Sequence, residues 1–549
     1  MNDINFPFLK TLTPLCAFII PGIIQAQELP RKPNVVIILA DDMGYSDLGC
    51  YGGEINTPNI DKLANNGIRF TQFYNAGRCW PTRSSLLSGY YPNAINMDPI
   101  HPQKPCPVWV KTLPQYLKEA GYKTYHSGKW HFINKPLPVG DGGFDKSFCD
   151  EANGQFSYEQ LLNDKPVEVH DGDKGKYLTI VQTDHAIEFL RDHKENYGNT
   201  PFFLYLAYDA PHFPLMALQE DIDKYRERYN KGWDYLKQER WRKMKKLGLV
   251  NHPVPPSEVD VNQTYGHLMP DSVLIDSLGN KEVLYPVAWN RLTRKEKKFQ
   301  SIKMTVHAAM VDRIDQETGR LIEQLKSMGA FENTLIFFLS DNGASAEIMI
   351  RGNGHDVHTK PGNDSTYLCL GPGWANASNT PFRRYKSWTH EGGISTPLIV
   401  HWPDGIKDKG KLRSNPGHII DFIPTLLDLT GLHQVETWQG SLVPPLPGKS
   451  LIPAFAKGGT VNRDYLYFHH HGLFENDPDN RALRTDSWKI VSSGTDNNKW
   501  ELYNLGTDRG EQNDRSEEMP ELLEMMVKKW TEIERVQNIL YHQNIKDEK

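Results

Sequence analysis

The sequence predicts an α/β fold: a large mixed, mostly parallel sheet sandwiched by helices, with a smaller C-terminal antiparallel sheet plus helix. Three observations support this prediction. A continuous β-branched run at 34–40 is typical of a parallel strand that is buried on both faces. Strand patterns and helix patterns then alternate as far as Gly431, which predicts helices on both faces of one sheet. After Gly431, short aromatic-rich stretches replace this alternation.

The first helix is expected at 57–64, because Thr57 suits the N-cap, Pro58 suits the first helical position and Gly67 follows. The later elements of the alternating region are expected as a helix at 113–120, a strand at 122–125, a helix at 178–190, a strand at 202–206, a long helix through 310–325, strands at 335–339 and 397–400, and a helix at 419–429. A charged segment at 233–246 lies in an insertion, 216–300, that is expected outside the main sheet.

The C-terminal part is expected as a subdomain of its own. Pro444, Pro445 and Pro447 indicate a linker before it. Strands are expected at 465–468 and 488–491, and a closing helix at 517–539. The predicted division is therefore a signal peptide at 1–26, a catalytic α/β domain at 27–435 and a C-terminal α+β subdomain at 436–549.

The N-terminus has the pattern of an export signal. Lys10 precedes an apolar run at 15–24, which is too short to span a bilayer and leads into a polar stretch. We expect cleavage near Ala26; a membrane anchor is the alternative interpretation. No later segment is apolar enough to cross a membrane, so the mature protein is expected in the periplasm or outside the cell.

Composition narrows the function classes. Hydrophobic residues make up 38% and charged residues 24%, which is typical of a folded globular protein. The net charge of -6, without a run of Lys or Arg, argues against nucleic acid as a partner. Beyond the signal, five cysteines remain, an odd number that raises the question of what the extra thiol does. Pairing among the other four, Cys50, Cys106, Cys149 and Cys369, is left open.

The segment Cys79-Trp80-Pro81-Thr82-Arg83 is the sharpest motif. Pro81 suits the start of a helix, so Cys79 is expected beside free backbone N–H groups, which favour an anion such as sulfate. Arg83, one turn later, would lie on the same face and add a fixed positive charge. The alternative is a small buried residue or half of a disulfide.

Two pairs of residues with side-chain oxygens, three of them acidic, follow predicted strands. Asp41 and Asp42 come directly after the strand at 34–40, and Asp341 and Asn342 come after the strand at 335–339. Ligand sites in open α/β sheets lie at the carboxyl ends of strands. Either pair alone is also an ordinary turn sequence. Together they offer only oxygen ligands, which suits Ca²⁺ or Mg²⁺ and argues against zinc.

Further polar residues are candidates for the same site. In an extended chain, Lys129 and His131 would point to the same side. His212 follows the strand at 202–206, and Lys386 precedes a Gly-Gly pair together with His390. A surface lysine and a structural histidine are the ordinary alternative for each.

The Cys79 segment closely resembles the sulfatase signature Cys-x-Pro-Ser/Thr-Arg, and the other motifs follow in the family's order. The resemblance extends from Asn34 to the Trp500–Leu505 phrase and is closest to bacterial arylsulfatase-like enzymes, in the alkaline phosphatase superfamily. It implies an alkaline phosphatase-like fold. It also implies that a maturation enzyme oxidises Cys79 to formylglycine (3-oxoalanine), whose hydrate is the nucleophile.

By the same resemblance, one calcium ion is held by Asp41, Asp42, Asp341 and Asn342 with an oxygen of formylglycine 79. Arg83, Lys129 and Lys386 would offset the charge of the sulfate. His131 would assist the formylglycine, and His212 or Lys386 would protonate the departing alcohol. The expected substrate is a sulfated carbohydrate such as an algal polysaccharide fragment. Residues 233–246, Lys360 and Trp374 are candidates to line the leaving-group pocket, with ordinary surface as the alternative.

Two other functions stay open at this point. A phosphate or phosphonate ester hydrolase of the same superfamily shares much of this pattern, but such enzymes tend to carry His where this chain has Asn342. A catalytically silent glycan-binding protein would require Cys79 to remain a thiol. Exo or endo action and the oligomeric state are not predicted.

Overall fold

The computed structural model describes residues 32–546 except 98–103, 153, 157, 168–174, 260, 262–268, 280, 353, 473–478 and 495–497. Pro33–Lys549 group together by their contacts, separately from Met1–Lys32. The expected signal peptide, 1–26, lies outside the described residues, so its cleavage and the export of the protein stay predictions. No helix in the described part of the chain has the length and apolar character of a membrane span.

The main sheet is mixed and mostly parallel, as predicted. Its centre is β1 (Asn34–Ala40), whose residues are buried from Val35 onward. β1 pairs in parallel with β7 on one side and β8 on the other. The strands follow one another in the order β10 (Lys411–Arg413), β2 (Ile68–Tyr74), β9 (Ser395–His401), β8 (Thr334–Ser340), β1, β7 (Phe202–Ala207), β3 (Lys123–Gly128), β4 (Lys146–Ala152), β5 (Tyr158–Leu162) and β6 (Lys165–Val167), with β11 (Gly417–His418) also paired to β2.

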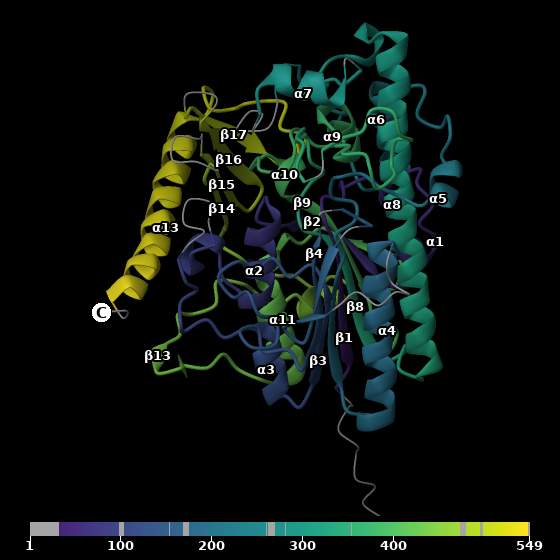
Figure 1. The fold of residues 1–549 in the computed structure, drawn as a ribbon. Coiled ribbons are helices and arrows are strands. Elements are labelled where there is room, and N and C mark those ends of the chain that lie inside the picture. The colour runs from purple at the N-terminus through teal and green to yellow at the C-terminus, as the bar shows by residue number, and fades with distance from the viewer. Residues whose placement is uncertain are drawn as a thin grey trace, which may run out of the picture. The chain divides into compact units, whose positions relative to one another are not determined.

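Helices cover both faces of this sheet (Figure 1). Alternate residues of β1 enter two different cores, because side chains alternate along a strand. The core that contains Val36 and Ile38 includes α1 (Pro58–Asn66), α4 (Leu178–Tyr197) and α8 (Arg294–Ser327). The core that contains Val35 and Ile37 includes α2 (Cys79–Ser88), α3 (Leu113–Glu119) and α11 (Phe422–Thr430).

The expected elements form, with some ends displaced. α4 continues past residue 190 to Tyr197. α8 begins at Arg294 because Thr293 and Glu296 form a capping box. The helix expected at 419–429 opens as a 3-10 turn over Ile419–Asp421 before α11. Thr57 precedes α1 as expected, but its hydroxyl accepts the N–H of Gly49 at 2.9 Å and does not cap the helix.

The insertion lies outside the main sheet, as expected. It contributes α5 (Gln219–Asp223), α6 (Trp233–Lys246) and α7 (Asp271–Leu278), and no strand among its described residues. Arg240 of α6 is fully buried and joins this helix to the segment between β1 and α1. Its guanidinium lies 2.6 Å from Asp47 and 2.8 Å from Glu54. The charged character of this segment thus reflects buried ion pairs as well as solvent exposure.

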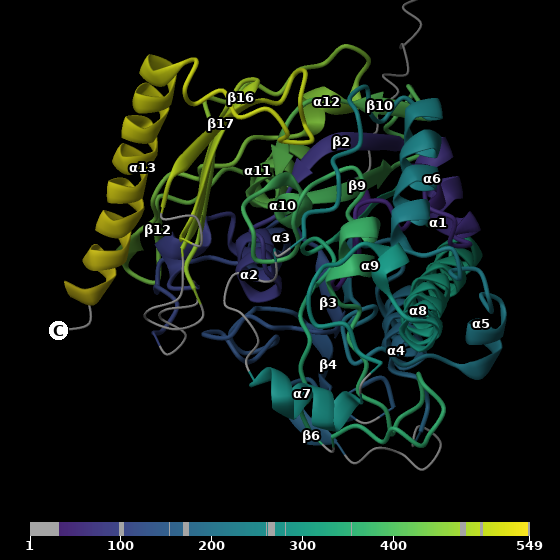
Figure 2. The same cartoon turned by 90° about the horizontal axis from the view of Figure 1, so that it is seen from above.

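The C-terminal sheet is antiparallel throughout, as predicted. It consists of β14 (Leu466–His470), β15 (Asn480–Thr485), β16 (Trp488–Ser493) and β17 (Trp500–Asn504). α13 (Pro520–Lys546) runs beside this sheet and packs on it through Met526, Trp530 and Ile533 (Figure 2). Short elements complete the described fold: α9 (Pro372–Ser378), α10 (Glu391–Ile394), α12 (Ile452–Phe455) and the pair β12 (Thr437–Trp438) and β13 (Ser441–Leu442).

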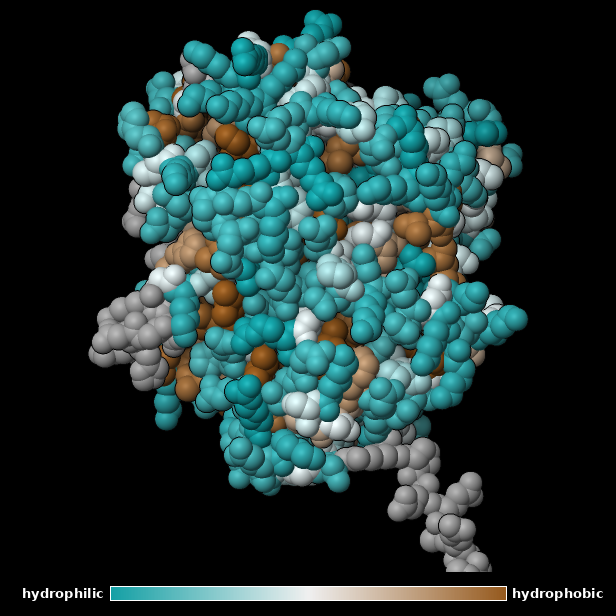
Figure 3. Space-filling view, turned by 90° about the vertical axis from the view of Figure 1, so that its right-hand side faces the viewer, coloured by the Kyte–Doolittle hydropathy of each residue, from teal (hydrophilic) through white to brown (hydrophobic). Residues whose placement is uncertain are grey.

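The face that carries α5 and α8 is mostly hydrophilic, with hydrophobic residues in small separate groups (Figure 3). This is typical of a water-exposed surface. The described cysteines are all buried thiols, so none of Cys50, Cys79, Cys106, Cys149 and Cys369 forms a disulfide here.

Candidate active site

The two acidic strand tips lie side by side. β1 and β8 are parallel neighbours with Ala40 opposite Ser340, so the residues that follow both strands meet at one edge of the sheet. The N–H of Asp42 donates to Asp341 Oδ1 at 3.2 Å. Asn342 Nδ2 donates to Asp42 Oδ1 at 2.6 Å. The side chains of Asp41, Asp42, Asp341 and Asn342 are all buried.

Cys79 is the first residue of α2, as the motif predicted. Arg83, one turn further on, is fully buried and points its guanidinium at the strand tips. Its nitrogens lie 2.8 Å from Asp341 Oδ2 and 3.4 Å from Asp41 Oδ2. It also donates to the carbonyl of Lys129 at 3.0 Å, which ties α2 to the chain that follows β3.

Two lysines complete the charge balance of this cluster. Lys129 forms an ion pair with Asp41. Lys386 Nζ lies 2.9 Å from Asp42 Oδ1 and 3.2 Å from Glu347 Oε2. Three carboxylates at the strand tips are thus compensated by Arg83 and two lysines, because buried charges without partners would be costly.

The surroundings separate the pKa values of the three carboxyls. Burial raises the pKa of Asp41, but the charges of Lys129, Arg83 and Lys386 outweigh it and hold that pKa far below its usual range. Burial raises the pKa of Asp42. Burial and the charge of Asp41 raise the pKa of Asp341 to about 7. Burial and the charge of Asp41 thus disfavour the ionised forms of Asp42 and Asp341, and a further cation at the strand tips would favour those ionised forms.

The two histidines are neutral in this arrangement. Burial and the charge of Lys129 lower the pKa of His131 well below its usual range. Burial and the charge of Lys386 lower the pKa of His212 to about 3. His212 Nε2 lies 3.5 Å from Asp42 Oδ2, so it faces the acidic cluster directly. A neutral imidazole can accept a proton, which fits a role in proton transfer.

A cavity of about 530 Å³ opens above this cluster. Its wall includes Cys79, Lys129, His131, His212 and Lys386. Arg83 and the strand-tip residues do not line it; they are buried and joined to its wall by the contacts given above. The structure therefore brings the candidate residues together at one cavity, while their individual roles stay predictions.

Some expectations about this region are corrected. Lys129 and His131 share the cavity wall, but His131 has φ +50° and does not continue an extended chain. The strand ends at Gly128, where a Cβ would lie 2.0 Å from the carbonyl of Ala207 and only glycine fits. His390 contacts Glu501 at 3.2 Å and does not line the cavity.

The expected leaving-group residues lie elsewhere. Trp374 is fully buried and packs against Trp233, with ring centroids 5.4 Å apart. Neither residue lines the cavity, and Lys360 does not line it either. These tryptophans belong to the hydrophobic core between α6 and α9 because both helices turn their apolar faces inward.

Several residues of the cavity were not predicted from the sequence. Glu347 forms ion pairs with both Lys386 and Arg78. Nη2 of Arg78 lies 3.2 Å from Oε1 of Glu347. On another part of the wall, the amide of Gln182 donates to Asp150 at 3.0 Å and to Asp209 at 2.8 Å. Arg78 directly precedes Cys79 and Asp209 lies three residues before His212, so proximity to the motifs was the available signal. Nothing local marks Glu347 or Asp150.

A family model described as Sulfatase matches residues 33–432, which is most of the chain and contains every residue of this site. The chain belongs to the sulfatase family. It is a sulfuric ester hydrolase, and its resemblance to sulfatases and its alkaline phosphatase-like fold are confirmed. A second model, described as N-sulphoglucosamine sulphohydrolase, C-terminal, matches residues 383–538 of this sulfatase.

Relatives match the sulfatase over nearly its whole length. An uncharacterized sulfatase of Schizosaccharomyces pombe is 33% identical, covering 92% of this chain and 94% of the relative. An arylsulfatase of Klebsiella aerogenes is 30% identical, covering 80% and 96%. The crystal structure of Ps i-CgsB in complex with k-i-k-neocarrahexaose is 25% identical, with a TM-score of 0.63 and coverage of 92% and 93%.

The strand tips of this sulfatase fit a hard divalent cation. Asp41 Oδ1 and Asn342 Oδ1 are both buried and, among the described residues, have no hydrogen-bond partner. Orphaned buried oxygens are costly unless a ligand satisfies them. Ligand atoms of Asp41, Asp42 and His212 also lie within 4.8 Å of one another. Carboxylate and amide oxygens are ligands that Ca²⁺ and Mg²⁺ prefer.

Proposed function

We propose that this sulfatase hydrolyses a sulfate ester on a sulfated carbohydrate, with Cys79 converted to formylglycine as nucleophile and one Ca²⁺ at the strand tips. Sulfatases of this family generally use a formylglycine and a divalent metal ion. The position of Cys79 carries the proposal, because it stands at the start of α2 in a cavity above three buried carboxylates. Export to the periplasm or beyond is part of the same proposal.

The residues that would hold calcium are Asp41, Asp42, Asp341 and Asn342, with an oxygen of formylglycine 79. Bound calcium would supply positive charge next to the sulfate and favour the ionised form of the attacking hydroxyl. Mg²⁺ is the less suitable ion, because it demands a stricter octahedral geometry.

Lys129 and Lys386, which line the cavity, bind and orient the sulfate, and the buried Arg83 adds positive charge behind them. These cations form ion pairs with the strand-tip carboxylates. A divalent ion held by the same carboxylates would leave the lysine charges available to the anion in the cavity. Fixed cations in a site that excludes water stabilise developing negative charge more strongly than they would in water.

Proton transfers are assigned to the groups that face the cavity. His131 is neutral and accepts the proton of the second formylglycine hydroxyl as sulfate departs. Two groups, His212 and Lys386, are candidates to protonate the leaving alcohol. The carboxylates around Lys386 raise its pKa above its usual range despite burial, so it carries a proton at neutral pH. His212 would gain its proton when the sulfate brings negative charge into the cavity.

The cavity wall suits a sugar. Asp150, Asp209 and Gln155 offer hydrogen-bond partners for hydroxyl groups, and Trp80 and Phe213 offer apolar ring surfaces. The similar structure of Ps i-CgsB is a complex with k-i-k-neocarrahexaose, and the C-terminal family model is described by a sulphoglucosamine hydrolase. These likenesses support a carbohydrate sulfate as the substrate class.

Replacing His212 with asparagine and, separately, Lys386 with methionine is expected to identify the proton donor. Loss of the donor should lower kcat/KM for a sugar sulfate by about 10²–10⁴-fold, but by less than about tenfold for a nitrophenyl sulfate, whose leaving group needs no proton. The other variant should lower the two rates by similar factors. The measurement is steady-state hydrolysis of both esters by the mature enzyme.

The matched phosphate esters serve as the control for reaction class. We expect the enzyme to hydrolyse the sulfate ester faster than the phosphate ester of the same alcohol. Asn342 stands where phosphate ester hydrolases of the superfamily tend to carry histidine. Faster hydrolysis of the phosphate ester would refute the proposed function.

A further inference from the structure

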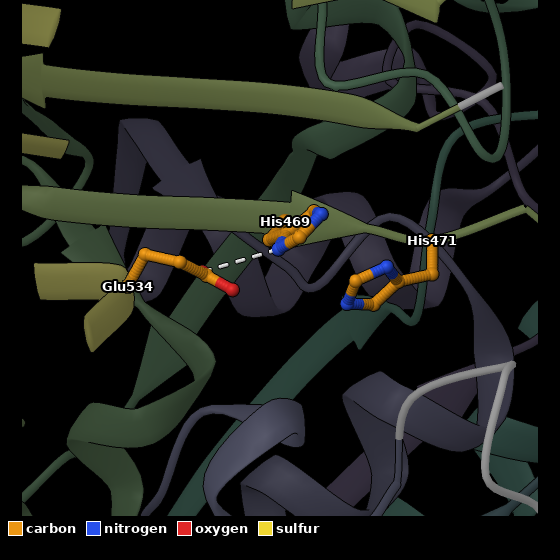
Figure 4. Close-up of side chains that lie close together, drawn as sticks. All are labelled: His469, His471 and Glu534. Atoms are coloured by element: carbon orange, nitrogen blue, oxygen red, sulfur yellow. Dashed lines mark hydrogen bonds and ion pairs between the residues drawn. The ribbon is translucent and has the colours of Figure 1, made fainter. Parts of the chain in front are cut away.

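A second group of metal-ligating side chains lies between β14 and α13 (Figure 4). His469 belongs to β14, His471 follows the end of that strand, and Glu534 comes from α13. The two histidine rings lie together, with centroids 3.7 Å apart. Nδ1 of His469 lies 3.1 Å from Glu534 Oε2. One ligand atom from each of the three residues lies within 4.8 Å of the other two, and none of the three lines the catalytic cavity.

The remaining ring nitrogens have partners of their own. Nε2 of His469 lies 3.3 Å from Asp479 Oδ2. In His471, Nδ1 lies 3.3 Å from Asp479 Oδ1 and Nε2 lies 3.2 Å from the amide of Asn93. Whichever nitrogen of His471 binds an ion, the other keeps a fixed partner. Metal-binding histidines usually donate their second N–H to a carboxylate or carbonyl, which fixes the tautomer.

The amide of Asn93 adds a separate observation. Its Oδ1 is buried and has no hydrogen-bond partner among the described residues, while its Nδ2 faces His471. Turning the amide over would let Oδ1 accept an N–H from His471 and would place Nδ2 in the buried position of Oδ1. That arrangement leaves Nδ1 of His471 with a free lone pair, as a metal ligand requires.

The carboxylates around the two rings also favour a cation. Glu534 and Asp479 both contact His469, and Asp479 also contacts His471. Two carboxylates thus lie beside the imidazoles, and a bound divalent ion would be held by their negative charge.

We propose that His469, His471 and Glu534 bind one Zn²⁺ ion. Asp479 and Asn93 orient the two imidazoles. Imidazole nitrogens with one carboxylate suit zinc, whereas the oxygen-only strand tips suit calcium, so the two sites select different metals. The zinc joins β14 to α13 and thereby fixes the helix that packs on the C-terminal sheet. This inference does not depend on the proposed function.

The test is a zinc titration of the untagged full chain. The protein is stripped with EDTA, excess Ca²⁺ is restored to protect the strand tips, and Zn²⁺ alone is added. Bound metal is counted by elemental mass spectrometry, and Tm is followed in parallel. We expect about one zinc per chain and a Tm rise of about 3 °C at a hundredfold excess over Kd.

Variants locate the bound zinc. The double variant His469→Gln/His471→Gln should lose this zinc and its Tm rise. Asp479→Asn removes only an orienting partner and should weaken zinc binding by about 10–100-fold. The matched control is His433→Gln, since His433 is exposed and distant in sequence from the cluster; it should bind zinc like the wild type.

Two outcomes would overturn the proposal. One is the absence of zinc uptake by the wild type under these conditions. The other is unchanged affinity in Asp479→Asn, which decides the matter even if the double variant fails to fold. Substitution with Co²⁺ gives an independent readout, because its visible absorption reports nitrogen ligation; the spectrum should change in Asp479→Asn and stay the same in His433→Gln.

Discussion

Replacing Cys79 with alanine is expected to lower kcat/KM for a sulfate ester by about 10⁴-fold or more, because the reaction loses its nucleophile. The substitution removes a single sulfur atom at the first residue of α2 and should leave the fold intact. Binding of the sulfate should change far less, since Arg83, Lys129 and Lys386 remain in place. The measurement is steady-state hydrolysis, with binding of inorganic sulfate measured in parallel by calorimetry.

Cys149→Ala is the matched control. Cys149 lines the same cavity and is equally a buried cysteine, but it lies on β4, away from the strand tips. Its loss should change kcat/KM by less than about tenfold, the range of an ordinary small packing change. Equal losses in the two variants, or an active Cys79→Ala enzyme, would contradict the assignment of the nucleophile.

Replacing Asp42 with asparagine is expected to abolish the stabilisation by calcium without destabilising the metal-free protein. Asp42 shares its site with two other buried carboxylates, and the removal of one negative charge relieves their repulsion. Lys386 keeps Glu347 as a partner at 3.2 Å. In the wild type, a hundredfold excess of Ca²⁺ over Kd should raise Tm by about 3 °C. In the variant this rise should vanish, and kcat should fall by about 10³-fold or more.

Differential scanning calorimetry with EDTA and with Ca²⁺ checks this prediction. The control is Asp150→Asn, which removes a buried carboxylate from the cavity wall but not from the strand tips. That variant should keep the calcium-induced rise in Tm. An Asp42→Asn protein that still responds to calcium, or a metal-free variant with a much lower Tm, would contradict the assigned metal ligands.

The strand tips could be predicted from sequence because their placement follows from topology. Parallel strands end at the same edge of a sheet, so Asp41 and Asp341 were expected at one edge, and the structure adds that β1 and β8 are neighbours. Cys79 and Arg83 were found because proline, helix start and helical spacing are local signals. The sequence predicted a mostly parallel sheet but did not identify its antiparallel strands, and β9 proves antiparallel to both of its neighbours.

Other features depend on tertiary contacts that no local pattern records. The close approach of Gly128 to β7 and the left-handed conformation of His131 are both visible only in the folded chain. Glu347 reaches Lys386 from a loop, and Trp374 turns into the core because α6 packs against it. The cluster of His469 and Glu534 joins residues 65 positions apart in the sequence, so it is visible only in the folded chain.

The chemical state of residue 79 decides whether formylglycine is the nucleophile. Trypsin cleaves after Arg78 and Arg83, so the peptide Cys79–Arg83 from active enzyme made in its own host can be weighed. A formylglycine at the start of α2 makes this peptide lighter by about 18 Da than its cysteine form. A fully active preparation in which every copy of the peptide retains the thiol would contradict the account.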